Sequence, residues 1–441
     1  MANGLRRLGI GLLVTLFGVL SAPAWGQSDE WYEISKAGLR AADEGRFNDA
    51  EQLFREALKL SNAYGEDDPR HATSVNNLGY ILHAQGKYLA AEPHYRDSLA
   101  MREAALAPDH PDIAQSCNNL AELYRVLGRY EEAETLHRRA LRIRETTLGQ
   151  SHPDVAQSLN NLGVLLANHG QLEEAEPLYQ RALEIRTRSY GPEHLTTAET
   201  LNNLATLYYA QNRFDEAGEI YRKALAIEES TLGPNHPSIA TTLSNLAELH
   251  RIQKRFDQAI ELHERALAIR ERVLGPSHPE TAQSLNNLAV AHYETKNYKD
   301  AEDLYKRSVE IKETALGITH PELALTLNNL AELYRSQRRF EEAEPLYHRA
   351  LEIDERSLGP AHPNLALGLN NLALLHYDQG AYVKAEPLLR RALTIEEQAL
   401  GSEHPELITT LENYAAVLRE LRKYDEAERL EARANQLRAQ L

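Results

Sequence analysis

The sequence predicts an all-α protein in which helical hairpins stack into one solenoid, and three observations support this fold class. The pair Asn-Asn returns every 42 residues from Asn76-Asn77 to Asn370-Asn371, with Ser244-Asn245 and Glu412-Asn413 at two further positions of the same register. Apolar residues recur at helical spacing inside each repeat. Proline and glycine recur at the repeat boundaries, where helices begin and end. A fixed period of this size is typical of stacked repeats that contact only their neighbours.

The first 26 residues differ in kind from the rest of the chain. Arg6 and Arg7 precede an uncharged stretch over residues 8–20, and small residues then allow cleavage after Ala24 or Gly26. This layout predicts a secretory signal peptide that is short for a transmembrane helix. We therefore expect residues 27–441 to form a single solenoid of about ten hairpins, exported to the periplasm or secreted. The alternative is that an uncleaved N-terminal segment tethers the protein; after cleavage no stable membrane insertion is expected.

The composition restricts the classes of partner. The chain has 48 Lys and Arg residues against 65 Asp and Glu residues, a formal net charge of −17. This balance argues against nucleic acid, whose binding depends on neutralising phosphates, and against an anionic membrane surface. The single cysteine, Cys117, cannot form an intrachain disulfide, so burial must hold the fold together. Because leucine or valine fills the same position in other repeats, we expect Cys117 to be a buried apolar residue.

One repeat, residues 151–191, illustrates the predicted hairpin. Pro153 suits the first position of a helix over about 153–168, and a short turn separates it from a second helix over about 172–189. Gly191 then ends the second helix. Each hairpin has two apolar faces and cannot bury both alone, so it must pack against the next. Pro177 and its copies at 93, 345 and 387 fall inside the second helix, which predicts either a bend or a later helix start.

A single apolar stripe runs along each first helix. In the repeat before Gly149 its members follow the spacing of one helix face: Ile113, Cys117, Leu120, Ala121, Tyr124 and Leu127. Small residues recur at the Ala121 position of the first helix and at the Ala133 position of the second. They predict close approach of the paired helices.

These residues together resemble the tetratricopeptide repeat. The family pattern is met by Leu120-Ala121, Tyr124, Gly128-x-Tyr130, Ala133 and Ala140, and the resemblance covers about residues 32–440. The 42-residue period and the Leu-Gly-x-x-His-Pro linker are similar to those of kinesin light chains. The resemblance implies a right-handed superhelix whose first helices line a concave groove that holds an extended peptide. The export signal, and the lack of a heptad region for pairing with a heavy chain, argue against a motor role.

A column of asparagines is the main candidate for ligand binding. It lies opposite the apolar stripe on a helical wheel. We predict that the groove includes Asn119, Asn161, Asn203, Asn245, Asn287, Asn329 and Asn371. Asparagine carries both donors and acceptors, so such a column can pair with the backbone of an extended ligand. The alternative is that these amides bond to adjacent helices and lock the stack.

A second, less uniform column adds arginine and tyrosine to the predicted groove. Its members are Arg125, Tyr209, Arg251, Tyr293, Arg335 and Tyr377. The three arginines follow Glu122, Glu248 and Glu332 by three residues. Each such pair either neutralises itself on the helix surface or leaves the arginine to fix a ligand carboxylate. The two interpretations are evenly balanced, so the charge of the ligand is not predicted.

A column of eight histidines precedes the first helices, from His110 to His404. They lie 42 residues apart, so neighbouring copies cannot close around one metal ion, and we expect them to cap helices or pack loops. His194 is followed by Leu195 in place of proline, which predicts a weaker helix start. The sequence has no phosphate-binding loop, metalloprotease motif or nucleophile elbow. We therefore predict no enzyme activity, no metal and no small-molecule cofactor.

The sequence as a whole predicts an exported scaffold or adaptor that binds a protein or peptide in its groove. One alternative is a structural component of a cell-envelope assembly that uses outer faces or chain ends. A second alternative is an enzyme with a site assembled in the groove. The sequence does not name the partner, the pathway or the oligomeric state.

Overall fold

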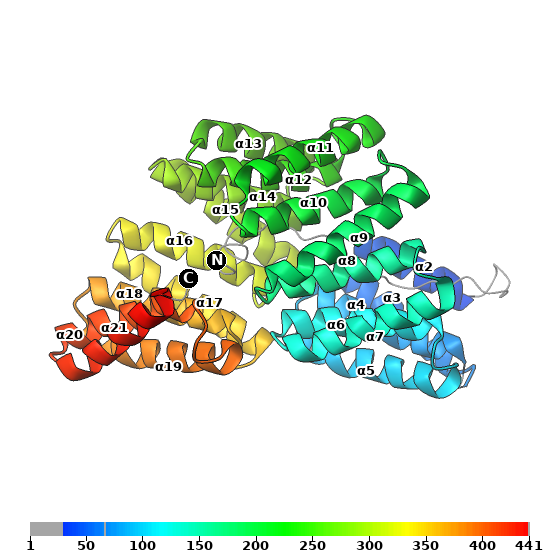
Figure 1. The fold of residues 1–441 in the computed structure, drawn as a ribbon, viewed down its shortest axis with the longest axis horizontal. Helices are drawn as coiled ribbons and strands as arrows, with labels where there is room; N and C mark the ends of the chain where they lie inside the picture. The colour runs from blue at the N-terminus through cyan, green and yellow to red at the C-terminus, as the bar shows by residue number, and fades with distance from the viewer. Residues whose placement is uncertain (1–29, 66–67, 440–441) are drawn as a thin grey trace. The chain divides into compact units, whose positions relative to one another are not determined.

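The computed structural model describes residues 30–65 and 68–439, which form twenty helices, labelled α2 to α21, joined by short loops (Figure 1). The all-α class is confirmed. The predicted signal peptide and its cleavage site lie outside the described residues. Within those ranges, no helix combines the length and apolar character needed to span a membrane.

The helices pair in sequence as hairpins. The first helices of the hairpins are α2 (Glu30–Asp43), α4 (Pro69–Ala84), α6 (Pro111–Val126), α8 (Pro153–Asn168), α10 (Leu195–Ala210), α12 (Pro237–Ile252), α14 (Pro279–Glu294), α16 (Pro321–Ser336), α18 (Asn364–Asp378) and α20 (Leu407–Glu420). The second helices are α3 (Phe47–Asn62), α5 (Tyr88–Ala105), α7 (Tyr130–Leu148), α9 (Leu172–Tyr190), α11 (Phe214–Leu232), α13 (Phe256–Val273), α15 (Tyr298–Leu316), α17 (Phe340–Leu358), α19 (Tyr382–Leu400) and α21 (Tyr424–Ala439).

The chain divides into two compact units whose boundary falls within α14. The N-terminal unit extends to Asn287, and the C-terminal unit runs from Leu288 to Leu441. In the N-terminal unit, α3, α5, α7, α9 and α11 each pack against the first helix of their own hairpin and against the first helix of the next. The first helices also approach one another directly, from α4 through α12. The C-terminal unit repeats this arrangement, with α16, α18 and α20 in the row of first helices.

Helix starts follow the histidine column, as predicted. In each case the Nδ1 atom accepts a hydrogen bond from the backbone N–H two residues later, at 3.2 Å for His110 and for His152. His194 makes the same bond to Thr196, also at 3.2 Å, and α10 begins at Leu195. The predicted weaker start of this helix is not found, because the imidazole caps the helix whether or not proline follows it.

The predicted apolar stripe forms the core. Every member from Ile113 to Leu127 is buried, and burial raises the pKa of the Cys117 thiol to about 11. Ala133 and its copies in the other second helices are completely buried. A methyl group at this position leaves no space between the paired helices, so a larger side chain would separate them.

The prolines inside the second helices do not delay the helix start. Helix α9 begins at Leu172 and includes Pro177, and α5 begins at Tyr88 and includes Pro93. Because proline has no backbone N–H, Pro177 cannot donate to the carbonyl of Glu173. Both residues are exposed. Water can therefore satisfy that carbonyl, which explains why the helix tolerates the proline.

Candidate functional site

The asparagine column lies along the row of first helices, but most of its members are buried. Asn119, Asn161, Asn203, Asn245 and Asn287 are buried, whereas Asn329 and Asn371 are half-buried. Burial of an amide requires hydrogen-bond partners, so the partners of these side chains decide what the column can do.

Several of these amides bond to the neighbouring first helix. Asn119 Nδ2 donates to Asn76 Oδ1 at 3.0 Å, and Asn203 Nδ2 donates to Asn160 Oδ1 at 2.9 Å. Gln115 Nε2, one turn earlier on α6, donates to Asn119 Oδ1 at 3.0 Å. At these positions the amides hold adjacent hairpins together, as the alternative interpretation of the sequence requires.

Asn245 differs from these neighbours. Its side chain on α12 is 2% exposed, and neither its Nδ2 nor its Oδ1 has a hydrogen-bond partner among the described residues. Its counterpart 43 residues earlier is Asn202, whose Nδ2 donates to Thr242 Oγ1 at 2.7 Å and whose Oδ1 also has no partner among the described residues. Within the described residues, Asn245 is therefore a column amide whose donors and acceptor are not engaged.

The arginine–glutamate pairs in the second predicted column are formed. Arg125 Nε donates to Glu122 Oε2 at 2.8 Å, and Arg251 Nε donates to Glu248 Oε2 at the same distance. Burial favours a raised pKa for Glu122, but the positive charge of Arg125 outweighs it and holds that pKa below its ordinary value. These arginines are already paired within their own helix, so a ligand carboxylate would have to compete with a glutamate.

The tyrosines of this column differ in exposure. Tyr209 is buried and its hydroxyl donates to Glu248 Oε1 of the next first helix at 3.3 Å. Tyr293 and Tyr377 are half-buried, and their rings contact Tyr298 and Tyr382 respectively. Tyr293 and Tyr377 therefore retain part of their ring surface for a ligand, and Tyr209 retains little.

Sequence reasoning missed a third column, which lies on the second helices. We call it the junction column, and its members are Arg102, Arg144, Arg186, Glu228, Arg270, Lys312, Asp354 and Glu396. All eight side chains are buried. Charged residues are almost never buried without partners, so this column has a specific role at the contact between successive hairpins.

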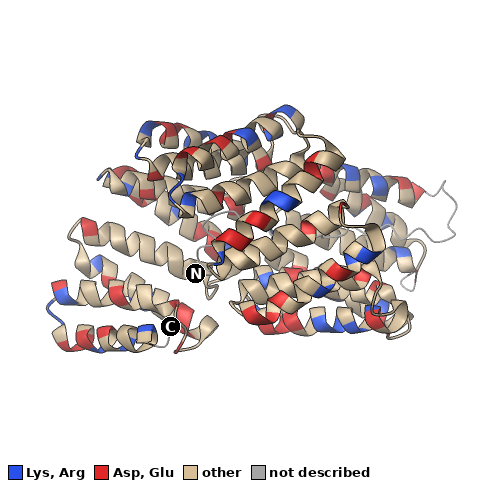
Figure 2. Ribbon diagram, turned by 45° about the horizontal axis from the view of Figure 1, so that its top comes forward, with Lys and Arg blue, Asp and Glu red and all other residues tan. Residues whose placement is uncertain are grey.

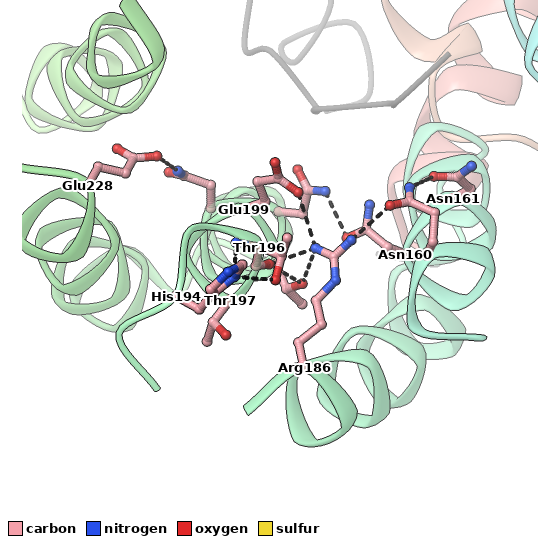
Figure 3. A network of polar contacts seen from close by, with 12 residues as sticks. Asn160, Asn161, Arg186, His194, Thr196, Thr197, Glu199 and Glu228 are labelled. Atoms are coloured by element: carbon pink, nitrogen blue, oxygen red, sulfur yellow. Dashed lines mark hydrogen bonds and ion pairs between the residues drawn. The ribbon is translucent and has the colours of Figure 1, made fainter. Parts of the chain in front are cut away.

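Arg186 shows how a basic member of this column works (Figure 3). Its Nη1 donates to the backbone carbonyl of Thr196 at 2.7 Å and to Thr200 Oγ1 at 2.8 Å, both on the next first helix. Its Nη2 donates to Gln157 Oε1 on α8 at 2.8 Å. Gln157 in turn donates to Asn161 Oδ1 at 2.8 Å. One buried side chain thus connects three helices and reaches the asparagine column.

The pattern that reveals this column is a pair of spacings. Arg102, Arg144 and Lys312 bond to the carbonyl ten residues ahead and to a serine or threonine hydroxyl fourteen residues ahead. A basic residue near the end of one helix, followed fourteen residues later by a hydroxyl group in the next, is visible in the sequence. Taken singly, each basic residue resembles one on a solvated helix face.

Charges on the surface are interspersed in sign along the helices (Figure 2). Many are paired between neighbouring hairpins, such as Arg181 with Glu145 at 2.6 Å and Arg129 with Glu92 at 2.8 Å. Exposed pairs of this kind contribute little stability each. The described residues hold no group of three or more His, Cys, Asp or Glu side chains placed to bind a metal ion.

The model of the Tetratricopeptide repeat family matches the chain in overlapping segments, at residues 35–104, 72–146, 112–187, 154–230, 211–271, 238–314, 322–398 and 365–439. The chain is a tetratricopeptide repeat protein. Its ten hairpins, built on a 42-residue period, are therefore tetratricopeptide repeats, and the expected array of such repeats is confirmed. Repeats of this type typically form non-enzymatic scaffolds for protein–protein interaction.

Solved structures of several other proteins are similar to this one. BtubC (BKLC) from P. vanneervenii is 26% identical, with a TM-score of 0.44 over 52% of this chain and 92% of that chain. Putative kinesin light chain repeats of Podospora anserina are 28% identical, with a TM-score of 0.39 over 46% of this chain and 97% of that chain. A Rap protein complexed with Competence and Sporulation Factor is 14% identical, with a TM-score of 0.53 over 84% and 98%. A comparison with curated protein sequences gives no match.

Proposed function

We propose that this tetratricopeptide repeat protein is an exported scaffold that binds an extended segment of a partner protein along its row of first helices. The observation that carries the proposal is the half-buried pair Tyr293 and Tyr377, which keep ring surface on the first helices of a tetratricopeptide array. Asn245 has both donor and acceptor unengaged among the described residues, but at 2% exposure it must become more exposed to meet a ligand. An extended backbone offers one N–H and one C=O per residue, which are the partners such an amide needs. A Rap protein of similar fold is complexed with Competence and Sporulation Factor, which supports the binding of a partner by a fold of this kind.

Position-specific crosslinking tests where the partner binds. A photoreactive residue in place of Ile252, exposed at the end of α12, is expected to crosslink the partner in the native host. The same residue in place of Glu219, exposed on the second helix α11, serves as the control. Crosslinks from Glu219 and not from Ile252 would place the partner on the outer face and contradict the proposal.

Alanine variants then separate ligand binding from stacking. Asn245→Ala removes no internal hydrogen bond and is expected to weaken the Ile252 crosslink while leaving the melting temperature within about 2 °C of wild type. Asn119→Ala removes the bond to Asn76 and should lower stability by about 1 kcal/mol. An undiminished crosslink in Asn245→Ala would show that this amide does not hold the partner.

Export is tested by the N-terminus of the protein isolated from fractionated cells. The proposal expects a chain that begins at Trp25 or Gln27, after cleavage at Ala24 or Gly26. A chain that keeps residues 1–26 and stays in the cytoplasm would contradict it. A chain that keeps them in the membrane fraction would favour the tethered form.

A further inference from the structure

In three hairpins the residue of the junction column is acidic and not basic. Five of its members are basic, but Glu228 on α11, Asp354 on α17 and Glu396 on α19 are acidic. Glu228 is 4% exposed and Glu396 is 6% exposed. A buried carboxylate needs several donors to replace its hydration, so the groups around each one decide its ionisation.

Glu228 receives few donors. Asn202 Nδ2 on α10 donates to Glu228 Oε1 at a distance of 3.2 Å and lies closer, at 2.7 Å, to Thr242 Oγ1 on α12. Glu228 Oε2 is buried and has no hydrogen-bond partner among the described residues. The charged groups that act on it are both acidic, Glu199 on α10 and Glu229 on its own helix. No basic side chain is among the described groups that act most strongly on its charge.

Glu396 repeats this arrangement in the C-terminal unit. Asn370 Nδ2 on α18 donates to Thr410 Oγ1 on α20 at 2.7 Å, as Asn202 does to Thr242. Glu396 Oε2 is likewise buried without a partner among the described residues. The charged groups that act on it are Glu406 on α20 and Glu397 on its own helix. The asparagine–threonine bond beside a buried glutamate therefore occurs twice, once in each unit, and at Glu396 the asparagine donates to Ala366 O in place of the glutamate.

The basic members show what this position accommodates. They donate into acceptors of the next first helix: a backbone carbonyl ten residues ahead and a hydroxyl group fourteen residues ahead. A protonated carboxyl group can donate to the carbonyl, whereas an ionised carboxylate cannot. The hydroxyl groups of Thr242 and Thr410 can donate to the carboxylates and offset only part of the effect of burial. Burial accordingly raises the pKa of Glu228 and of Glu396 to about 7.

We propose that the hairpin contacts at Glu228 and Glu396 are proton-dependent joints, closed while the buried carboxyl group is protonated and loosened when it ionises. The loosening is local: α11 separates from α12, and α19 separates from α20, without unfolding of either unit. This device acts through the contact between hairpins and is independent of ligand binding along the first helices.

Hydrogen–deuterium exchange of the full chain at pH 6 and pH 8 tests the proposal. Protection factors, corrected for intrinsic exchange, report the opening equilibrium of α11 and α12. The carboxyl group titrates near pH 7 while the hairpin contact is closed and near its ordinary pKa when the contact is open. The opening equilibrium constant should therefore rise about tenfold from pH 6 to pH 8. The Glu228→Gln variant keeps the shape of the side chain but cannot ionise, so its protection factors should be the same at both pH values.

Two further variants decide the outcome. Glu219→Gln removes an exposed carboxylate from the same helix and should keep the tenfold change. Glu396→Gln should abolish the pH dependence at α19 and α20 alone, and it provides the test if Glu228→Gln does not fold. Wild-type protection that is equal at both pH values, or a tenfold change that persists in both glutamine variants, would overturn the proposal.

Discussion

At the scale of single residues, the turn within each hairpin requires a left-handed backbone. Gly128 has φ +71° and Gly170 has φ +82° in this turn. Lys254 and Arg338 occupy the same position in other repeats with φ +60° and +61°. A residue with a Cβ atom in this region is strained by about 1–2 kcal/mol. The turns at Lys254 and Arg338 therefore store strain that the glycine turns do not.

The strain at this turn predicts opposite effects for exchanges in the two directions. Lys254→Gly should raise the free energy of unfolding by about 0.5 kcal/mol, because the relief of strain exceeds the greater flexibility that glycine gives the unfolded chain. Gly128→Ala should lower it by about 1 kcal/mol. Urea denaturation measures both changes. If Lys254→Gly loses as much stability as Gly128→Ala, the backbone at Lys254 is not strained.

Replacement of a core leucine should change the free energy of unfolding by more than these turn exchanges do. Leu288 on α14 is 4% exposed, and its replacement by alanine should lower the free energy of unfolding by about 2–5 kcal/mol. Leu89→Ala is the matched control, because Leu89 is 51% exposed on α5 and should change stability by less than about 0.5 kcal/mol. A loss below about 1 kcal/mol for Leu288→Ala in denaturant melts would show that the apolar stripe is misassigned.

At the scale of helices, the junction column fixes how one hairpin meets the next. The acceptors that hold Arg186 have counterparts around Glu228: the Ser238 carbonyl, ten residues ahead, and the Thr242 hydroxyl, fourteen residues ahead. The acid therefore occupies a position whose surroundings are built for a donor.

Restoring a donor at this junction should stabilise it. Glu228→Arg is expected to raise the melting temperature of the protein at pH 8, where the native carboxyl group is ionised, and to have a smaller effect at pH 5.5. Calorimetry at the two pH values measures the difference. A lower melting temperature at pH 8 would show that the contact between α11 and α12 cannot accommodate the longer side chain.

The helices themselves were predictable from local signals. The first helix over 153–168 matches α8, and the second ends at Tyr190, one residue after the predicted Ser189. Helix starts and stops depend on residues within a few positions, such as His152 and Gly191, so one repeat suffices to locate them. The signals that set these bounds lie inside the segment being predicted.

The partners of polar side chains were less predictable, because they come from other repeats. The amide of Asn203 bonds to Asn160, 43 residues earlier, whereas among the described residues Asn245 makes no such bond to Asn202, its counterpart 43 residues earlier. The ligand role of the asparagine column stays a prediction. The junction column was missed because an isolated Arg186 in a helix is usually solvated, and only its distant partners show that it is buried.

At the scale of the whole molecule, the two units bury titratable groups of opposite kinds. In the N-terminal unit, burial lowers the pKa of His83 and of His137 to about 4 and that of His263 to about 3. In the C-terminal unit, burial raises the pKa of Asp354 and of Glu396 to about 7. The histidines disfavour protons in the folded state, and the acids favour them.

These groups predict opposite responses of the units to acid. As pH falls from 6.5 to 4.5, the unfolded N-terminal unit gains protons on histidines that stay neutral when folded, so its stability falls; three histidines outweigh the single opposing Glu228. Over the same range folded Asp354 and Glu396 hold protons that their unfolded counterparts, with ordinary pKa values near 4, mostly do not, so the stability of the C-terminal unit rises as pH falls. Hydrogen exchange, resolved by peptide, measures the two units separately, and parallel changes in both would contradict the prediction.

The hydrogen bonds of the junction column limit which insertions and deletions the chain can tolerate. A single residue inserted between Arg144 and Ser158 turns the next helix by about 100° and carries the hydroxyl away from the guanidinium. Excision of residues 145–186, in contrast, brings Thr196 and Thr200 to the positions ten and fourteen residues after Arg144. Shortened or lengthened forms of this protein should therefore fold when they differ by whole repeats, and excision of 187–228 gives one without the acidic joint at Glu228.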